Sequence, residues 1–428
     1  MENIENKVLN ILSEEIVVAE GCTEPNALAY AAALGRKYLK EIPYKIEAEI
    51  SGNIVKNVKG VIIPNSNGLK GIRSSIALGL YCGNSDLGLM VISDVNTECA
   101  QKANDYRKSG SIIVSQADTD IKLYIHLKMY TENNVAEIEI KHLHTNVTKL
   151  IVDGVNITPS TCDDTWQFNT SLQDREFLSI SLIHEVANKI DIEKIKCIFK
   201  EVVEKNMEIS KEGLDRDYGT SVGKILLREA EINKYMNPGL EIACYAAAGS
   251  DARMNGCSLP VMTTSGSGNQ GMTASIPVIR YCQLNNIDED KMYRALLFSH
   301  LTTVHIKTNV GRLSAFCGVI CAAGAVAGTI SYIETNDYDV IAGSISNTFG
   351  NISGIVCDGA KASCAMKINT AIQTAYNSFL LAKNSKVLEA GDGIIGNCIE
   401  ETIRNVGKVA SDGMQVTDET ILEIMSRE

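Results

Sequence analysis

The spacing of hydrophobic and polar positions predicts a chain built from two kinds of segment. Residues 5–19 carry apolar side chains at helical spacing, and an alanine-rich stretch after Pro25 predicts a second helix over residues 26–39. From Tyr44 onward, short alternations of apolar and polar residues that are typical of strands take over. The predicted strands cover residues 44–50, 61–63, 90–93, 111–115, 122–129, 136–141 and 149–153, with predicted helices at 70–81 and 95–107 between them.

Beyond Thr158 the strand pattern almost disappears and helical periodicity dominates. The predicted helices cover residues 174–189, 191–210, 219–235, 240–253, 270–286, 288–308, 313–333, 336–348, 360–383 and 417–426. We therefore predict an α+β fold in which a mostly helical domain carries an inserted mixed α+β domain. The helical domain is expected to comprise residues 1–43 and 158–428, and the inserted domain residues 44–157.

Charge and composition narrow the classes of function. The 428-residue chain has a formal net charge of −12, and an acidic surface repels phosphate backbones, so we expect no nucleic-acid partner. The first 15 residues alternate in charge and lack the apolar centre of a secretion signal, which favours a cytoplasmic protein. Thirteen cysteines in such a chain argue against a disulfide framework. Most suit small buried apolar positions, but their number also points to metal or redox chemistry.

One uncharged stretch, residues 313–333, is long enough to span a bilayer. It is rich in alanine, glycine, serine and cysteine, which insert weakly into membranes. We therefore predict a tightly packed internal helix and no membrane partner.

The densest chemical signal lies between residues 305 and 367. Cys317 and Cys321 share a helix face, and Cys357 and Cys364 are six residues apart across a glycine-containing loop. Thiolates are soft ligands for zinc, copper or iron–sulfur centres, but the spacing matches neither a zinc ribbon nor a ferredoxin. Spacing alone therefore leaves a shared metal site and buried structural cysteines both open.

Cations flank these cysteines, namely Lys307, Arg312, Lys361 and Lys367. Positive charge lowers the pKa of a thiol and favours the thiolate that ligation or nucleophilic chemistry requires. The alternative is that they are helix-end and surface charges.

A glycine- and serine-rich segment at residues 264–271 contains the pattern GxGxxG. A dinucleotide site needs strands on both sides of the following helix, and the sequence offers no second strand. A loop that opens a helix still presents free amides to an anion, so we expect it to hold a substrate carboxylate. A tight turn between two helices is the alternative.

Two further patterns carry less information. Cys22 lies in a glycine- and proline-interrupted break between helices, where a thiol is either inert or directed into a cleft. The six histidines form no HExxH motif, which disfavours a histidine-based zinc hydrolase.

Four segments carry a resemblance to a known family that extends over essentially the whole chain. They are EGCTEP at 20–25, SGSGNQG at 265–271, IKTNVGRLSAFCG at 306–318 and GIVCDGAKASCAMK at 354–367. In these segments the chain resembles the L-cysteine desulfidases, within the group related to the iron–sulfur L-serine dehydratase alpha chain.

The resemblance implies a 4Fe-4S cluster held by Cys317, Cys357 and Cys364, with one open iron. Cys321 matches no family cysteine. Cys22 is the candidate base for the alpha proton, or else a cluster ligand in place of Cys364.

The resemblance also implies further site residues. Arg312 and Lys361 are catalytic candidates that would lower a thiol pKa or help hold the carboxylate. The candidates for substrate binding are Glu24, Ser267, Gly268, Asn269 and Gln270.

The implied reaction is non-redox elimination of sulfide from L-cysteine, giving pyruvate, ammonia and hydrogen sulfide without pyridoxal phosphate. Three alternatives remain: an L-serine dehydratase with the same cluster, a non-enzymatic iron–sulfur sensor or binding protein, and a dinucleotide-dependent oxidoreductase. A homodimer is expected from base rates alone.

Overall fold

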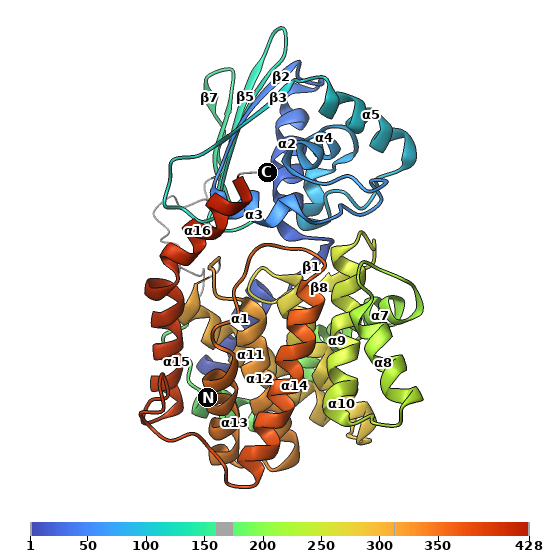
Figure 1. The fold of residues 1–428 in the computed structure, drawn as a ribbon. Coiled ribbons are helices and arrows are strands. Elements are labelled where there is room, and N and C mark those ends of the chain that lie inside the picture. Colours follow the sequence, from blue (N-terminus) through green and yellow to red (C-terminus); the bar gives the residue numbers. More distant parts are fainter. Residues whose placement is uncertain (1, 160–173, 312, 427–428) are drawn as a thin grey trace.

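A computed structural model describes residues 2–159, 174–311 and 313–426, and in it the chain forms two units with separate hydrophobic cores (Figure 1). The larger core lies among helices. These helices are α1 (Glu2–Glu15), α6 (Ile180–Lys189), α7 (Glu193–Asp215), α8 (Val222–Ile232), α9 (Pro238–Met254), α10 (Gly268–Leu284), α11 (Glu289–Val310), α12 (Gly318–Glu334), α13 (Tyr338–Ile352), α14 (Cys364–Lys383) and α15 (Ile399–Lys408).

The smaller unit is a six-stranded sheet with helices on one side (Figure 1). The strands, in spatial order, are β3 (Ile112–Gln116), β2 (Lys45–Ile50), β4 (Tyr124–Tyr130), β5 (Val135–Lys141), β6 (Val147–Val152) and β7 (Val155–Asn156). The helices are α2 (Thr23–Leu39), α3 (Gly52–Lys59), α4 (Ile72–Cys82), the 3-10 helix η1 (Ser85–Met90) and α5 (Thr97–Lys108). Only the β2–β3 pair is parallel.

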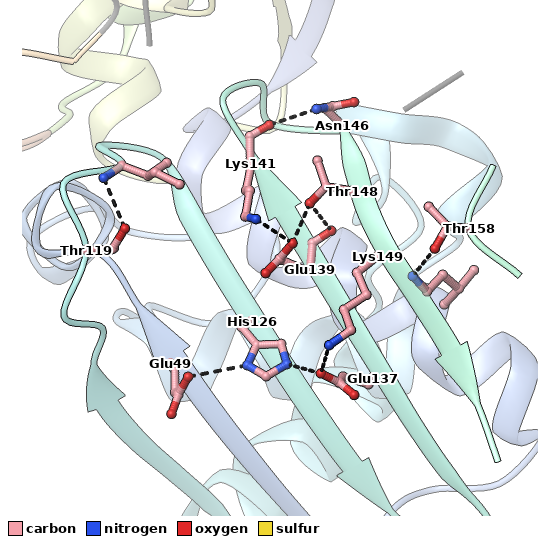
Figure 2. A network of polar contacts seen from close by, with 12 residues as sticks. Glu49, Thr119, His126, Glu137, Glu139, Lys141, Asn146, Thr148, Lys149 and Thr158 are labelled. Carbon is pink, nitrogen blue, oxygen red and sulfur yellow. Dashed lines mark hydrogen bonds and ion pairs between the residues drawn. The ribbon is translucent and has the colours of Figure 1, made fainter. Parts of the chain in front are cut away.

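Alternating side chains give the sheet two different faces. In β4 and β5 every second residue is buried, and these residues pack against α2. Helix α2 lies so close that a Cβ at Gly35 would overlap the side chain of Met129. The other face carries ion pairs: the His126 ring bridges Glu49 and Glu137, and Lys149 Nζ lies 2.6 Å from Glu137 Oε1 (Figure 2).

Two pieces of described structure lie where the units meet. Strand β1 (Val18–Glu20) pairs antiparallel with β8 (Pro260–Met262). At the other end of the chain, a π-helical turn η2 (Val409–Gly413) leads from α15 into α16 (Gln415–Ser426), and α16 reaches α3 of the sheet unit (Figure 1).

The predicted α+β fold is confirmed, and several elements differ from their predictions. The first helix ends at Glu15 because residues 18–20 form β1. The strand predicted at 90–93 is wrong, since Met90 ends η1 and turns follow; at 61–63 only an isolated bridge of Ile62 forms. Helices α3 and α15 were not predicted.

The packing of α2 differs from the expected assignment of residues 1–43 to the helical domain. Its alanines and Leu28 belong to the core of the sheet unit, together with residues of α4 and β5. The chain therefore enters the core of the sheet unit before position 43, the predicted boundary. The division into domains stays a prediction.

Two further expectations concern the cysteines and the uncharged stretch. Cys82 and Cys99 form a disulfide between α4 and α5, whose neighbouring backbones bring the two Cα atoms to 5.6 Å, so this pair is not the free thiols we expected. Among the described residues, no helix has the length and apolar character needed to cross a membrane.

Candidate functional site

A pocket lies at the junction of the two units and encloses about 880 Å³, part of it open to solvent. The sheet unit and its helices contribute Thr23, Glu24, Asn53, Lys56, Asn57, Leu123 and His144 to the wall. The helical unit contributes Arg253, residues 265–267, Asn269, Gln270, Lys307, residues 313–314 and 316–319, Cys357, residues 359–360 and Cys364; Cys22 precedes α2.

The β1–β8 pair brings two of the sequence motifs together. It holds the strand before segment 20–25 antiparallel to the strand before loop 264–271, with Glu20 opposite Pro260 and Val18 opposite Met262. Thr23 Oγ1 then donates a hydrogen bond to the carbonyl oxygen of Gly266, at 3.0 Å. Residues more than 240 positions apart therefore form one wall.

Backbone pairing also aligns two of the cysteine segments. Phe316 and Val356 form an antiparallel bridge, and the Cys317 amide donates to the Ile355 carbonyl oxygen at 3.2 Å. Cys357 follows directly, and Cys364 begins α14 a few residues later. As a result Cys317, Cys357 and Cys364 all line the pocket, with Cys22 opposite the last of them near Met254 and Ala360.

Four helices begin at this pocket. Cys22 precedes α2, Ser267 caps α10, Cys317 precedes α12 and Cys364 is the first residue of α14. The positive ends of helix dipoles stabilise thiolates and other anions. The pocket is therefore built to receive negative charge.

Burial works in the opposite direction on the free thiols. It raises the pKa of Cys22 to about 12, although the charge of Arg253 lowers it. Burial also raises the pKa of Cys317 and of Cys364, and the nearby thiol of Cys357 adds to both shifts, while Lys367 opposes them. At neutral pH the thiols of Cys22, Cys317 and Cys364 are therefore protonated. A metal centre would have to displace the protons of its cysteine ligands on binding.

In the part of the chain that the structure describes, no three His, Cys, Asp or Glu side chains are grouped to hold one metal ion. Cysteine sulfurs are the donors that an iron–sulfur cluster takes. Cys317, Cys357 and Cys364 supply the soft sulfur donors for it.

A polar group that the sequence analysis did not assign surrounds Glu24. Its Oε1 accepts from Asn57 Nδ2 at 2.9 Å and lies 3.9 Å from His144 Nε2, which has no hydrogen-bond partner. Burial would raise the pKa of Glu24, but His144 and Arg253 outweigh it and lower the pKa to about 2. Glu24 is therefore a carboxylate at neutral pH. No motif marks His144, which lies two positions after His142 in the sequence.

Arg253 is the second residue that the sequence analysis missed. It ends helix α9 in the pocket wall, only 3% exposed, and its Nη1 donates to Asn269 Oδ1 at 3.2 Å. Its Nε has no hydrogen-bond partner, and neither do the side-chain amide of Gln270 and the hydroxyl of Ser265. No motif marks Arg253, because it lies outside the four conserved-looking segments of the resemblance.

The remaining site candidates lie in different places. Ser267, Asn269 and Gln270 line the pocket, whereas Gly268 packs against Arg253 behind the wall. Lys361 is not in the wall, because its ammonium binds Asp358. Arg312 lies outside the described residues.

Fold and pocket together define an α+β protein with a thiol-lined cavity between two units. Residues 86–423 match the model of the family described as the serine dehydratase alpha chain, and the chain belongs to this family. The family relation indicates a lyase-type enzyme related to iron–sulfur proteins.

Several relatives are similar over their full length. A UPF0597 protein of Fusobacterium nucleatum is 50% identical over 428 residues, which covers 100% of both chains. One of Desulfitobacterium hafniense is 44% identical over 418 residues, 97% of this chain and 96% of its own. Another, of a Shewanella species, is 36% identical over 435 residues and 100% of both chains.

Proposed function

We propose that this chain is an iron–sulfur-dependent lyase that eliminates sulfide from L-cysteine. The products are pyruvate, ammonia and hydrogen sulfide, with water consumed and no net redox change. The observation that carries the proposal is the presence of three thiols in one pocket, the buried Cys317 and the half-buried Cys357 and Cys364, beside the glycine- and serine-rich loop that opens α10. Membership of a lyase-type family supports it.

The cluster would be held by Cys317, Cys357 and Cys364. When bound with one open iron, such a cluster supplies a Lewis acid for a thiolate leaving group. The positive ends of α12 and α14 and the charge of Lys367 support the thiolate forms of Cys317 and Cys364.

The chain's own residues orient the substrate and take its alpha proton. The amides and side chains of residues 265–270 hold the carboxylate at the start of α10. Cys22 Sγ is our candidate acceptor of the alpha proton, and its thiolate requires the support of Arg253 and of the α2 dipole. His144 Nε2, which lies 3.9 Å from Glu24 Oε1 and makes no hydrogen bond within the described residues, is the second candidate acceptor.

Loss of the alpha proton and of sulfide from the beta carbon leaves aminoacrylate. This product tautomerises to an imine, which water hydrolyses to pyruvate and ammonia. All atoms are thereby accounted for without an external oxidant or reductant.

The test is an anaerobic assay of pyruvate and sulfide released from L-cysteine by the purified protein. We expect both products in equal amounts and in proportion to bound iron. Turnover of L-cysteine by iron-free protein would reject the proposal.

A second candidate function is dehydration of L-serine at the same site, and the description of the matched family favours it. The ratio of kcat/KM for L-cysteine to that for L-serine decides between them. Pyruvate from neither amino acid would favour a non-enzymatic iron–sulfur protein.

A further inference from the structure

Arg253 and Glu24 are two opposite charges that face the same pocket. Arg253 comes from the last turn of α9 and Glu24 from the first turn of α2, and both are buried. Arg253 is close enough for its charge to stabilise the ionised Glu24, yet no ion pair joins them in the described part of the chain. The pocket therefore keeps a positive and a negative pole apart.

The positive pole has unused hydrogen-bonding capacity. Arg253 spends Nη1 on Asn269 and leaves Nε without a partner, and Gln270, only 1% exposed, uses neither its amide nitrogen nor its amide oxygen. A buried donor without a partner costs about 1–3 kcal/mol. Several such groups around one cavity indicate a ligand with two acceptor oxygens, and a guanidinium matches a carboxylate in shape.

The negative pole is held in place by a donor of its own unit. Glu24 Oε1 accepts from Asn57 Nδ2 of α3 at 2.9 Å, which fixes the carboxylate at the pocket wall. A carboxylate accepts up to about four hydrogen bonds, so it retains capacity for an ammonium group.

We infer that these two residues read the backbone of a free L-amino acid: Arg253 binds the alpha-carboxylate and Glu24 the alpha-ammonium. This inference rests on the proposed function and assigns the two residues that would bind the charged groups of its substrate. The alpha-carboxylate and the alpha-ammonium are attached to the same carbon of the substrate. Binding both groups therefore also sets the direction of the substrate side chain. Met254, the neighbour of Arg253 in the chain, packs with Cys22 and Cys364, so these thiols lie in the same pocket as the backbone-reading pair.

Two thiol analogues of L-cysteine test the roles of Arg253 and Glu24 separately. Cysteamine keeps the ammonium and lacks the carboxylate, and 3-mercaptopropionate keeps the carboxylate and lacks the ammonium. Dissociation constants for both, and for L-cysteine, are to be measured by anaerobic calorimetry on the iron-loaded full chain.

The expected result is a crossed pattern. Arg253→Gln weakens binding of 3-mercaptopropionate about 10- to 100-fold and changes that of cysteamine less than about twofold. Glu24→Gln does the reverse, and L-cysteine weakens in both. Arg253→Lys, which keeps the charge, restores part of the affinity for 3-mercaptopropionate. Arg280→Gln, which breaks an ion pair with Glu241 outside the pocket, is the matched control.

Iron content and the visible spectrum must match the wild type in every variant, so that lost binding is not lost cofactor. Equal weakening of both analogues by either variant, with iron retained, would overturn the inference. Sulfide release from L-cysteine without the crossed pattern would leave the proposed function standing and the inference wrong. The crossed pattern without sulfide release would support the inference and reject the proposed function.

Discussion

Gly271, in the first turns of α10, packs closely against the backbone of the segment that precedes this helix. A Cβ there would lie 2.2 Å from the carbonyl oxygen of Met262 and 2.8 Å from the Cα of Thr263. Because backbone atoms cannot move aside cheaply, we expect Gly271→Ala to lower the free energy of unfolding by about 1–3 kcal/mol. The measurement is denaturant unfolding. Gly354→Ala, which meets nothing within 4 Å, is the control and should change stability far less.

Cys22 and His144 make different predictions as proton acceptors. If Cys22 takes the alpha proton, Cys22→Ala keeps its iron and loses about 100-fold or more in kcat, because a positioned base contributes about that much. His144→Gln would then reduce kcat much less. Iron analysis beside the kinetic assay checks both variants. Loss of iron from Cys22→Ala would instead make Cys22 a ligand.

The C-terminal helix α16 is attached to the sheet unit through contacts that include a buried ion pair. Asp418 Oδ1 lies 2.6 Å from Lys56 Nζ, with side chains 3% and 1% exposed, and Lys56 Nζ also donates to the Cys357 carbonyl oxygen at 3.2 Å. Asp418→Asn leaves the ammonium buried without its charge partner, so we expect a loss of about 3–5 kcal/mol in the stability of this attachment. Hydrogen exchange in residues 415–426 should rise. Asp412→Asn, at an exposed position, should leave it unchanged.

The same ion pair gives α16 a defined pH dependence. Burial would raise the pKa of Asp418, but Lys56, Asn53 and Lys122 outweigh it and hold the pKa below the usual 3.8. A carboxylate with a lowered folded pKa contributes its full stability above its usual pKa and loses it as pH falls through the folded value. The protection factors of the α16 amides, which correct for the intrinsic pH dependence of exchange, should therefore be constant from neutral pH down to about 4 and fall below it. A fall that begins near pH 6 would contradict this.

Elements with a clear period were predictable from the sequence, and elements defined by distant partners were not. The strands β4 and β5 and the long helices α7, α10 and α11 follow their hydrophobic periodicity. Strand β1 exists because Val18–Glu20 pairs with Pro260–Met262, a partner that no local pattern contains. The isolated bridge at Ile62 and the helix α3 depend on contacts in the same way.

The site shows the same division. Cys317, Cys357, Cys364, Cys22 and the loop at 265–270 are recognisable as motifs, and they meet in one pocket. His144 and Arg253 belong to no motif; they reach the pocket because the sheet unit and the end of α9 close on it. Patterns in the sequence thus identified the thiols and Glu24, whereas His144 and Arg253 required the tertiary structure.

At the scale of the whole molecule, the pocket has walls from both units, so a bound ligand should couple them. Glu24, Asn57 and His144 lie on one side, and Arg253 with the loop 265–270 on the other. We expect a saturating substrate analogue to slow hydrogen exchange in residues 52–59 and 142–146 together with residues 264–271. Mass spectrometry of the iron-loaded protein, with and without 3-mercaptopropionate, measures this. Protection confined to the helical unit would show that the sheet unit takes no part in binding.

The central claim is that Cys317, Cys357 and Cys364 hold a cluster in this pocket. The most direct measurement is the iron and acid-labile sulfide bound per chain after anaerobic purification of the wild type and of Cys→Ser variants. We predict about four of each in the wild type, loss in Cys317→Ser, Cys357→Ser and Cys364→Ser, and retention in the exposed control Cys398→Ser. Iron-free wild type, or full iron in any of the first three variants, would contradict the account.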